Sequence, residues 1–353
     1  MTETPFIITI DTEGDDLWTR SRGSREITTR NAAYLPRFQS LCERFRFKPV
    51  YLANYEMVMC DVFVEFARDV VARGACEIGM HLHAWNSPPL DPLTDDDFFY
   101  HPYLIEYPEQ VMKEKIRTLT RLLEDRFDQE MVSHRAGRWG FDGRYAAMLL
   151  EEGYRVDCSV TPGIDWGGSP GDPRGNGGPD YTGFPDRPYF LNPSDISRPA
   201  TGGLLEVPMT TRSSGLYRKA PWAYRFPLLR QAAHRVSPKL SWLCPIPLLE
   251  KNNLNAMLQV ARAARAVGVT HLEFMLHSSE LMPGGSPTYK DPSEIERLYK
   301  HLEILFEDLS TWCCGVTLKE FHARFSNGER PNDPATAVRH ETCQNADQAP
   351  GRA

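Results

Sequence analysis

Residues 6–14 read Phe-Ile-Ile-Thr-Ile-Asp-Thr-Glu-Gly, an apolar and β-branched run that ends among carboxylates. Such a run is typical of a strand that is buried on both faces of a parallel sheet. Successive side chains of a strand point to opposite faces, so Asp11 and Glu13 project in the same direction where the strand ends. Two buried carboxylates side by side favour a cation or a reaction that needs them. A helix cap or a solvated turn is the alternative, which we favour for Asp15 and Asp16.

The rest of the chain alternates strand-like and helical segments. Further strands are expected at 49–53, 77–83, 131–135, 154–160, 204–207 and 271–277, and helices at 34–45, 61–72, 111–127, 142–153, 252–267 and 291–309. This alternation predicts the α/β class with a parallel sheet, and the number of units suits a (β/α) barrel with its active site at the carboxyl ends of the strands.

The predicted barrel is one domain that spans residues 1–325. A stretch rich in Gly, Pro and Asp at about 163–203 interrupts it without periodicity, which is typical of a functional loop or an insertion. Residues 326–353 are polar and without periodicity, so we expect a disordered tail.

Composition excludes several classes of function. The chain has 353 residues, a net charge of -7 and no dominant basic patch, which argues against a nucleic-acid partner. It has no run of 18 apolar residues, so no membrane span is expected. The start of the chain lacks the features of a secretory signal, which predicts a cytoplasmic protein. The eight cysteines contain no Cys-x-x-Cys pair and fit reduced thiols.

Polar groups gather at the carboxyl ends of the predicted strands. They are Asp11 with Glu13, His81 with His83, His134 with Arg135, and His277. A single histidine after a strand is more often structural, and we expect that role for His134. His81 and His83 lie two residues apart on a strand and face one point. With Glu13 they form a two-histidine, one-carboxylate set that suits Zn²⁺ or another divalent transition metal.

Five short motifs occur in an order that resembles the NodB-like polysaccharide deacetylases, carbohydrate esterase family four. They are Thr-Ile-Asp-Thr-Glu-Gly at 9–14, Glu-Ile-Gly-Met-His at 77–81, Arg-Ala-Gly-Arg-Trp at 135–139, Asp-Cys-Ser at 157–159 and Met-Leu-His at 275–277. Three further segments, 178–180, 205–208 and 277–285, resemble the WalW-like branch, which is linked to bacterial surface polysaccharides. The resemblance covers residues 5–322.

The resemblance implies a distorted (β/α) barrel and metal-dependent hydrolysis of the N-acyl group of an amino sugar or glycan, in surface-polysaccharide or lipopolysaccharide biosynthesis. It implies Asp11 as general base, Glu13 and His81 as metal ligands, Arg135 as the partner that orients Asp11, His277 as general acid, and Asp157 as the residue that tunes His277. The base takes a proton from water, and the acid protonates the departing amine.

Three positions depart from the family pattern. The paired aspartates of the family are Asp11 and Glu13 here, one residue further apart. Trp85 stands where the family has its second metal histidine, so His83 is the candidate replacement. Residues 135–138 read Arg-Ala-Gly-Arg, which predicts a different groove wall.

Arg138 and several aromatic side chains are candidates for substrate binding. We expect Trp85, Trp139 and Arg138 to line the groove, and Trp166 and Tyr181 lie in or near the same loops. Aromatic rings stack on the apolar faces of sugars, and buried packing is the alternative for each ring.

Two other functions stay open. One is a carbohydrate-binding or scaffold protein with a degenerate metal site, which the tryptophan at position 85 favours. The other is an amide hydrolase with a non-sugar substrate, because a fold does not determine its substrate.

Overall fold

The computed structural model describes residues 3–15, 17, 27–169, 171–172, 177–213, 240–245 and 253–328. Its main sheet has ten strands, nine of which follow the order β11-β1-β2-β3-β4-β5-β8-β6-β7, while β12 pairs with the start of β1. The strands are β1 (Thr4–Thr12), β2 (Pro49–Ala53), β3 (Glu77–Leu82), β4 (Ser133–Ala136), β5 (Val156–Asp157), β6 (Tyr189–Asn192), β7 (Asp195–Ala200), β8 (Leu205–Glu206), β11 (Leu272–His277) and β12 (Cys313–Gly315). A separate two-stranded sheet joins β9 (Thr211–Ser213) to β10 (Leu240–Trp242).

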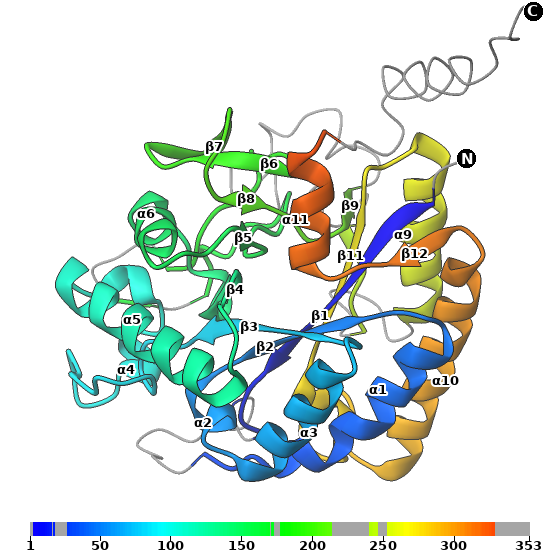
Figure 1. Cartoon of the computed structure of the whole chain (residues 1–353), viewed down its shortest axis with the longest axis horizontal. Helices are drawn as coiled ribbons and strands as arrows, with labels where there is room; N and C mark the ends of the chain where they lie inside the picture. Colours follow the sequence, from blue (N-terminus) through cyan, green and yellow to red (C-terminus); the bar gives the residue numbers. More distant parts are fainter. Residues whose placement is uncertain are drawn as a thin grey trace, which may run out of the picture.

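The sheet is parallel from β11 to β8 and antiparallel beyond it. It curls, so that the chain after β8 returns to β11, where the Thr210 N–H donates to the Glu273 carbonyl at 3.3 Å. The predicted (β/α) barrel is therefore confirmed as a distorted barrel (Figure 1). The stretch at 163–203 contains the antiparallel strands β6 and β7, which the sequence pattern did not indicate.

Helices cover the outer face of the curled sheet (Figure 1). The longer ones are α1 (Leu35–Arg44), α3 (Asp61–Ala72), α5 (Glu109–Phe127), α6 (Gly143–Glu151), α9 (Asn253–Val267), α10 (Pro292–Ser310) and α11 (Leu318–Ser326). Short turns of helix are α2 (Tyr55–Val58), α4 (Asp97–Tyr100), η1 (Arg30–Tyr34), η2 (Leu104–Glu106), η3 (Gly137–Trp139) and η5 (Ser278–Leu281). No helix among the described residues is both long enough and apolar enough to cross a bilayer.

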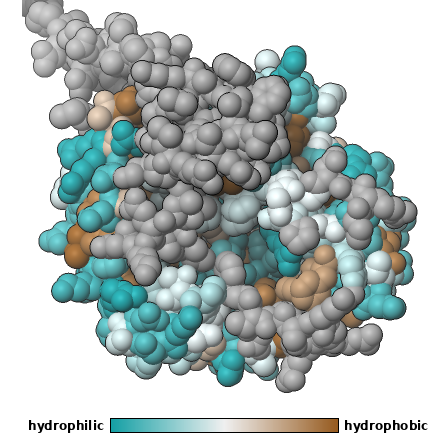
Figure 2. Space-filling view, turned by 180° about the vertical axis from the view of Figure 1, so that it is seen from behind, coloured by the Kyte–Doolittle hydropathy of each residue, from teal (hydrophilic) through white to brown (hydrophobic). Residues whose placement is uncertain are grey.

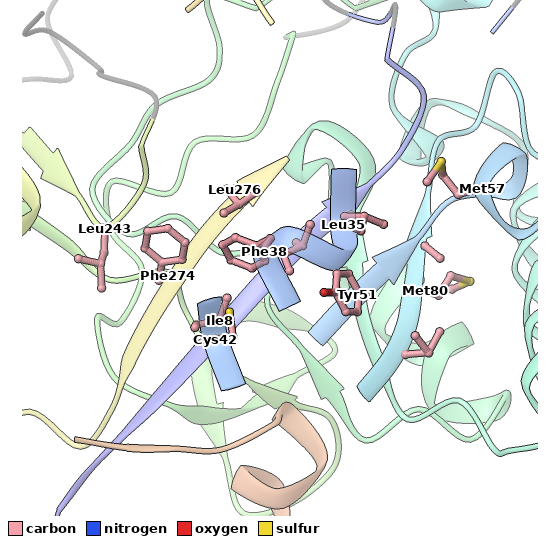
Figure 3. Packing of buried hydrophobic residues seen from close by; sticks show 14 of the residues in the cluster. Ile8, Leu35, Phe38, Cys42, Tyr51, Met57, Met80, Leu243, Phe274 and Leu276 are labelled. Carbon is pink, nitrogen blue, oxygen red and sulfur yellow. The ribbon is translucent and has the colours of Figure 1, made fainter. Parts of the chain in front are cut away.

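β1 is buried on both faces, as its sequence predicted. Ile8 packs outward against Phe38 of α1 and Phe274 of β11, in the larger core between sheet and helices (Figure 3). Ile7 points the other way, into a smaller apolar cluster with Val50 and other inward-facing residues. This inner cluster is the floor of the barrel.

The inner face of β1 becomes polar toward its carboxyl end. Ile7 is followed on that face by Thr9 and Asp11, which are both buried. The parallel register places Asp11 opposite His277 of β11, and His81 of β3 opposite Arg135 of β4. Parallel strands end at the same edge of a sheet, so these polar side chains share one end of the barrel.

The surface is hollowed on one side, and the cysteines form no disulfide among the described residues. Figure 2 shows a hollow with a hydrophilic floor near the middle of the face that is turned away in Figure 1, with apolar residues beside it. The seven cysteines among the described residues are all free thiols. The predicted tail at 326–353 lies outside the described residues beyond Gly328.

Candidate metal and catalytic site

The turn after β1 is held by contacts from three other segments. The Glu13 N–H donates to Ser278 Oγ at 3.1 Å, and Ser278 Oγ is also 3.1 Å from the Glu13 carbonyl oxygen. Asn31 Nδ2 donates to the same carbonyl at 2.7 Å, and the Gly14 N–H donates to Glu56 Oε1 at 2.7 Å. The backbone of Glu13 is therefore fixed, and its side chain is directed into the barrel mouth.

Glu13, His81 and His83 form one buried cluster. Glu13 Oε2 lies 2.7 Å from His83 Nε2 and 3.4 Å from His81 Nε2, and the two Nε2 atoms are 3.2 Å apart. The donor atoms all lie within 4.8 Å of one another. In a tetrahedral zinc site with ligand bonds of 2.0–2.1 Å, neighbouring donor atoms are separated by about 3.3 Å. The three donors therefore fit a divalent ion without rearrangement of the backbone.

The two histidines differ in how their rings are held. His81 Nδ1 lies 3.1 Å from the Arg135 carbonyl oxygen, so it donates there and leaves Nε2 free to bind a metal. His83 Nδ1 is buried and has no hydrogen-bond partner among the described residues. Gly137 packs against it, since a Cβ at that position would lie 2.6 Å from His83 Nδ1. Of the two rings, only that of His81 has the hydrogen bond at Nδ1 that commonly orients a metal-binding histidine.

The carboxylates Asp11 and Glu13 favour positive charge at His81. Burial would raise the pKa of Glu13, but its hydrogen bonds with His81 and His83 hold the pKa well below the usual value. Burial would lower the pKa of His81, and the charges of Asp11 and Glu13 outweigh burial and raise it. The negative charges of Asp11 and Glu13 would attract a divalent cation in the same way.

Arg135 lies fully buried beneath this cluster. Its guanidinium donates to Asp11 Oδ1 at 2.7 Å, to Glu273 Oε1 at 2.6 Å, to Thr9 Oγ1 at 2.8 Å and to the Cys158 carbonyl at 3.0 Å. Burial would raise the pKa of Asp11, and the charge of Arg135 reverses that effect, so the pKa is lowered. Asp11 is thus an oriented, ionised carboxylate.

Sequence reasoning missed Glu273, which completes this network. Glu273 accepts hydrogen bonds from Arg135 and from Thr9 Oγ1. The available signal was its position: Glu273 lies four residues before His277, so both side chains are on the same face of the strand. The apolar residues around Glu273 are typical of a buried core strand and gave no indication of a functional group.

His277 stands across the mouth from the cluster. Its Nε2 lies 3.9 Å from Asp11 Oδ2 and 4.0 Å from Glu13 Oε1. Burial would lower its pKa, but Glu280, Glu13 and Asp11 raise it to about 9. Glu280, also missed from the sequence, accepts the His277 N–H at 2.8 Å and lies 3.7 Å from His277 Nδ1.

The expected pairing of Asp157 with His277 is wrong. Asp157 Oδ1 lies 2.7 Å from His134 Nδ1, and its carboxylate also accepts from Ser159. His134 and Asp157 are register partners and share the face opposite to Arg135. That face packs against α6, where Tyr145 Oη lies 2.8 Å from His134 Nε2. Asp157 therefore points out of the barrel, and the carboxylate beside His277 Nδ1 is that of Glu280.

The aromatic side chains predicted for the groove belong to two separate ring clusters. Trp85 is half-buried, and its ring centroid lies 5.6 Å from that of His83 and 5.0 Å from that of Phe98. Trp139 stacks on Trp166 with a centroid separation of 4.6 Å and an interplanar angle of 9°.

The structure separates the other two candidates. Arg138 is half-buried, and its guanidinium lies 4.8 Å above the Phe98 ring. Tyr181 is fully buried and donates its hydroxyl to the Trp139 carbonyl, so it belongs to the packing rather than to an open platform.

Comparison with known proteins shows the fold. No protein-family model and no curated protein matches the sequence. The structure is similar to that of a protein from Parabacteroides distasonis described as a candidate glycoside hydrolase/deacetylase, with a TM-score of 0.58 and 11% identity over 94% of this chain and 73% of that one. It is also similar to a protein from Mycobacterium smegmatis described as a candidate polysaccharide deacetylase, with a TM-score of 0.51 and 14% identity over 93% and 92% of the two chains. The chain therefore has the distorted (β/α) barrel of the NodB-type polysaccharide deacetylases.

Proposed function

We propose that this protein is a metal-dependent deacetylase that hydrolyses the N-acyl group of an amino sugar. The observation that carries the proposal is the convergence of three metal-binding donors, which lie within 4.8 Å of one another, on an oriented carboxylate, Asp11, whose Oδ2 is 3.8 Å from His81 Nε2 and 3.9 Å from Nε2 of His277, the histidine with a raised pKa. The sequence motifs suggest a glycan of surface-polysaccharide or lipopolysaccharide assembly as the substrate.

Glu13, His81 and His83 would hold the ion. A bound Zn²⁺ or similar ion polarises an amide carbonyl and lowers the pKa of water. Asp11 would accept the proton of the attacking water at Oδ2, since Oδ1 is engaged by Arg135. His277 would donate the proton of Nε2 to the leaving nitrogen, because an amine leaves poorly unless it is protonated. Glu280 is placed to hold the His277 ring.

The test combines metal content with acetate release. The purified protein is expected to bind about one divalent ion per chain, and to lose it in Glu13→Gln and His81→Ala. His301→Ala, on α10 and away from the site, is the matched control and should retain the ion. Acetate release from N-acetylglucosamine oligomers should require the ion and disappear in Asp11→Asn. An Asp11→Asn protein with unchanged turnover would overturn the assignment of the base.

A carbohydrate-binding protein without catalysis is the second candidate. Trp85 at the position of the family's second metal histidine favours it, as does the lack of a hydrogen-bond partner for His83 Nδ1 among the described residues. Sugar binding with neither metal nor turnover would select this function. Acetate release only from N-acylated compounds that are not sugars would instead select a related amide hydrolase.

A further inference from the structure

Arg138 places a positive charge beside the Glu13, His81 and His83 cluster, and its N–H groups donate to no described residue. Its guanidinium forms no hydrogen bond and no ion pair with any described residue, and its central carbon lies over the Phe98 ring, 4.8 Å from the ring centroid. The side chain is half-buried, so part of it still reaches solvent. Arg135, three residues earlier, differs in that it is buried and donates four hydrogen bonds.

The backbone that carries Arg138 is held in an uncommon conformation. Arg138 and Trp139 have φ angles of 52° and 55°, in the left-handed region that is costly for residues with a Cβ. Tyr181 donates to the Trp139 carbonyl, and Gly137 lies in contact with the His83 ring. Tertiary contacts on both sides therefore fix where Arg138 leaves the chain, directly after the residue that touches His83.

Electrostatic effects link Arg138 to the cluster. Burial lowers the pKa of Arg138, while Tyr103, Glu13 and Glu106 act in the opposite direction. Burial also lowers the pKa of His83, and the charge of Arg138 adds to that effect. Arg138 and the proposed metal ligands are thus within electrostatic reach of each other.

Aromatic rings flank Arg138, whose N–H groups have no hydrogen-bond partner among the described residues. The rings of Trp85 and Phe98 meet at an interplanar angle of 88°, and the guanidinium carbon of Arg138 lies over the Phe98 ring. The planar fork of N–H groups of an arginine matches two oxygens of a carboxylate or phosphate. The apolar rings beside it suit the carbon face of a sugar.

We propose that Arg138 selects acylamino sugars that carry a negative charge, as a phosphate ester or a carboxylate, by binding that charged group next to the reacting amide. The inference rests on the proposed deacetylase function, because it names the class of substrate for the same site. The plainer role for Arg138 is to stack on Phe98 and support the aromatic wall.

Calorimetric binding separates the two roles. In the metal-loaded protein with Asp11→Asn, which keeps the ligands intact, we compare neutral N-acetylglucosamine with its 1-phosphate, its 6-phosphate and N-acetylmuramic acid. At least one charged sugar should bind about tenfold more tightly than the neutral sugar, as expected for a hydrogen-bonded charge. Comparison among the three distinguishes phosphate from carboxylate, and their positions on the ring.

Variants of Arg138 then test the cause. Arg138→Gln should reduce the ratio of charged to neutral affinity to about one, and Arg138→Lys should retain part of it. Arg121→Gln, at an exposed site on α5, is the control and should keep the full ratio. The thermal midpoint of each variant is measured, so that misfolding is recognised. A preference that survives Arg138→Gln, or no preference for any charged sugar, would overturn the inference.

Turnover is measured separately on the protein without Asp11→Asn. Acetate release without a charge preference would refute only the role of Arg138. Arg138-dependent binding without acetate release from any sugar would refute the deacetylase function and leave a binding site for charged sugars.

Discussion

Replacement of Arg135 by Met should expose how much the barrel mouth depends on one buried cation. The guanidinium is the common partner of Asp11 and Glu273, at 2.7 and 2.6 Å, and all three side chains are almost inaccessible to solvent. Without it, Glu273 loses its buried counter-charge, and Asp11 keeps only the more distant His81 and His277. Removal of one partner from a buried ion pair costs about 3–5 kcal/mol of unfolding free energy, and we expect a loss of that size.

A double-mutant cycle with Glu273→Gln tests the cause. The amide keeps the shape of Glu273 and removes its charge, so Arg135→Met should cost less in that background. Side chains that share a network show coupling energies of about 0.5–3 kcal/mol. Unfolding in urea at pH 8, followed by tryptophan fluorescence and circular dichroism, gives each free energy if the denaturant slope stays constant.

The pH dependence provides an internal check. Burial already raises the pKa of Glu273 with Arg135 present, and without Arg135 the effect of burial on the pKa of Glu273 and of Asp11 loses its main opposing charge, so both folded pKa values should rise further. Stability is then lost as the pH rises through the folded pKa values, so the cost of Arg135→Met should be smaller at pH 5 than at pH 8. Additive effects within about 0.5 kcal/mol, or a cost that does not change with pH, would refute the idea that this layer is an electrostatic unit.

Three further results are expected. Gly137→Ala should weaken divalent-metal affinity at least about tenfold, because the new Cβ would lie 2.6 Å from His83 Nδ1 and displace that ring. Gly168→Ala is the control, since its Cβ meets no atom within 4 Å and the metal affinity should not change. Equal affinities of the two variants in a metal titration would contradict this. Burial lowers the pKa of His271 from 6.5 to about 4, so this residue contributes stability above pH 6.5 that is lost as the pH falls toward 4. The unfolding free energy should therefore fall between pH 7 and pH 5, and this fall should be about 2 kcal/mol smaller in His271→Gln. Phe306→Ala should cost about 3–5 kcal/mol in urea unfolding, since the ring is fully buried among other aromatic rings; a cost below about 1 kcal/mol would argue against that packing.

Much of the candidate site was visible in the sequence because strand geometry is local. Alternation along a strand directs Asp11 and Glu13 to one side and places His81 beside His83, with no knowledge of the partner strands. Parallel strands share an end, so the polar residues that follow each apolar run had to meet. The same reasoning predicted the class of fold and its active face.

The remaining features depend on which face of the curled sheet each strand turns inward. Asp157 follows an apolar strand just as Asp11 does, but its register with His134 turns it toward α6, away from His277. Glu273 lies within an apolar run and becomes a functional group only because Arg135 comes from a strand 138 residues earlier.

The sequence by itself determined the buried central strand, the alternation that builds the barrel and the donors at its mouth, because each depends on residues close together in the chain. Only the tertiary structure decided that Glu280 rather than Asp157 stands beside His277, and that Arg138, near His83, has no hydrogen-bond or ion-pair partner in the part of the chain that the structure describes. Those outcomes depend on strand register and on contacts between distant segments, and no local pattern encodes either of them.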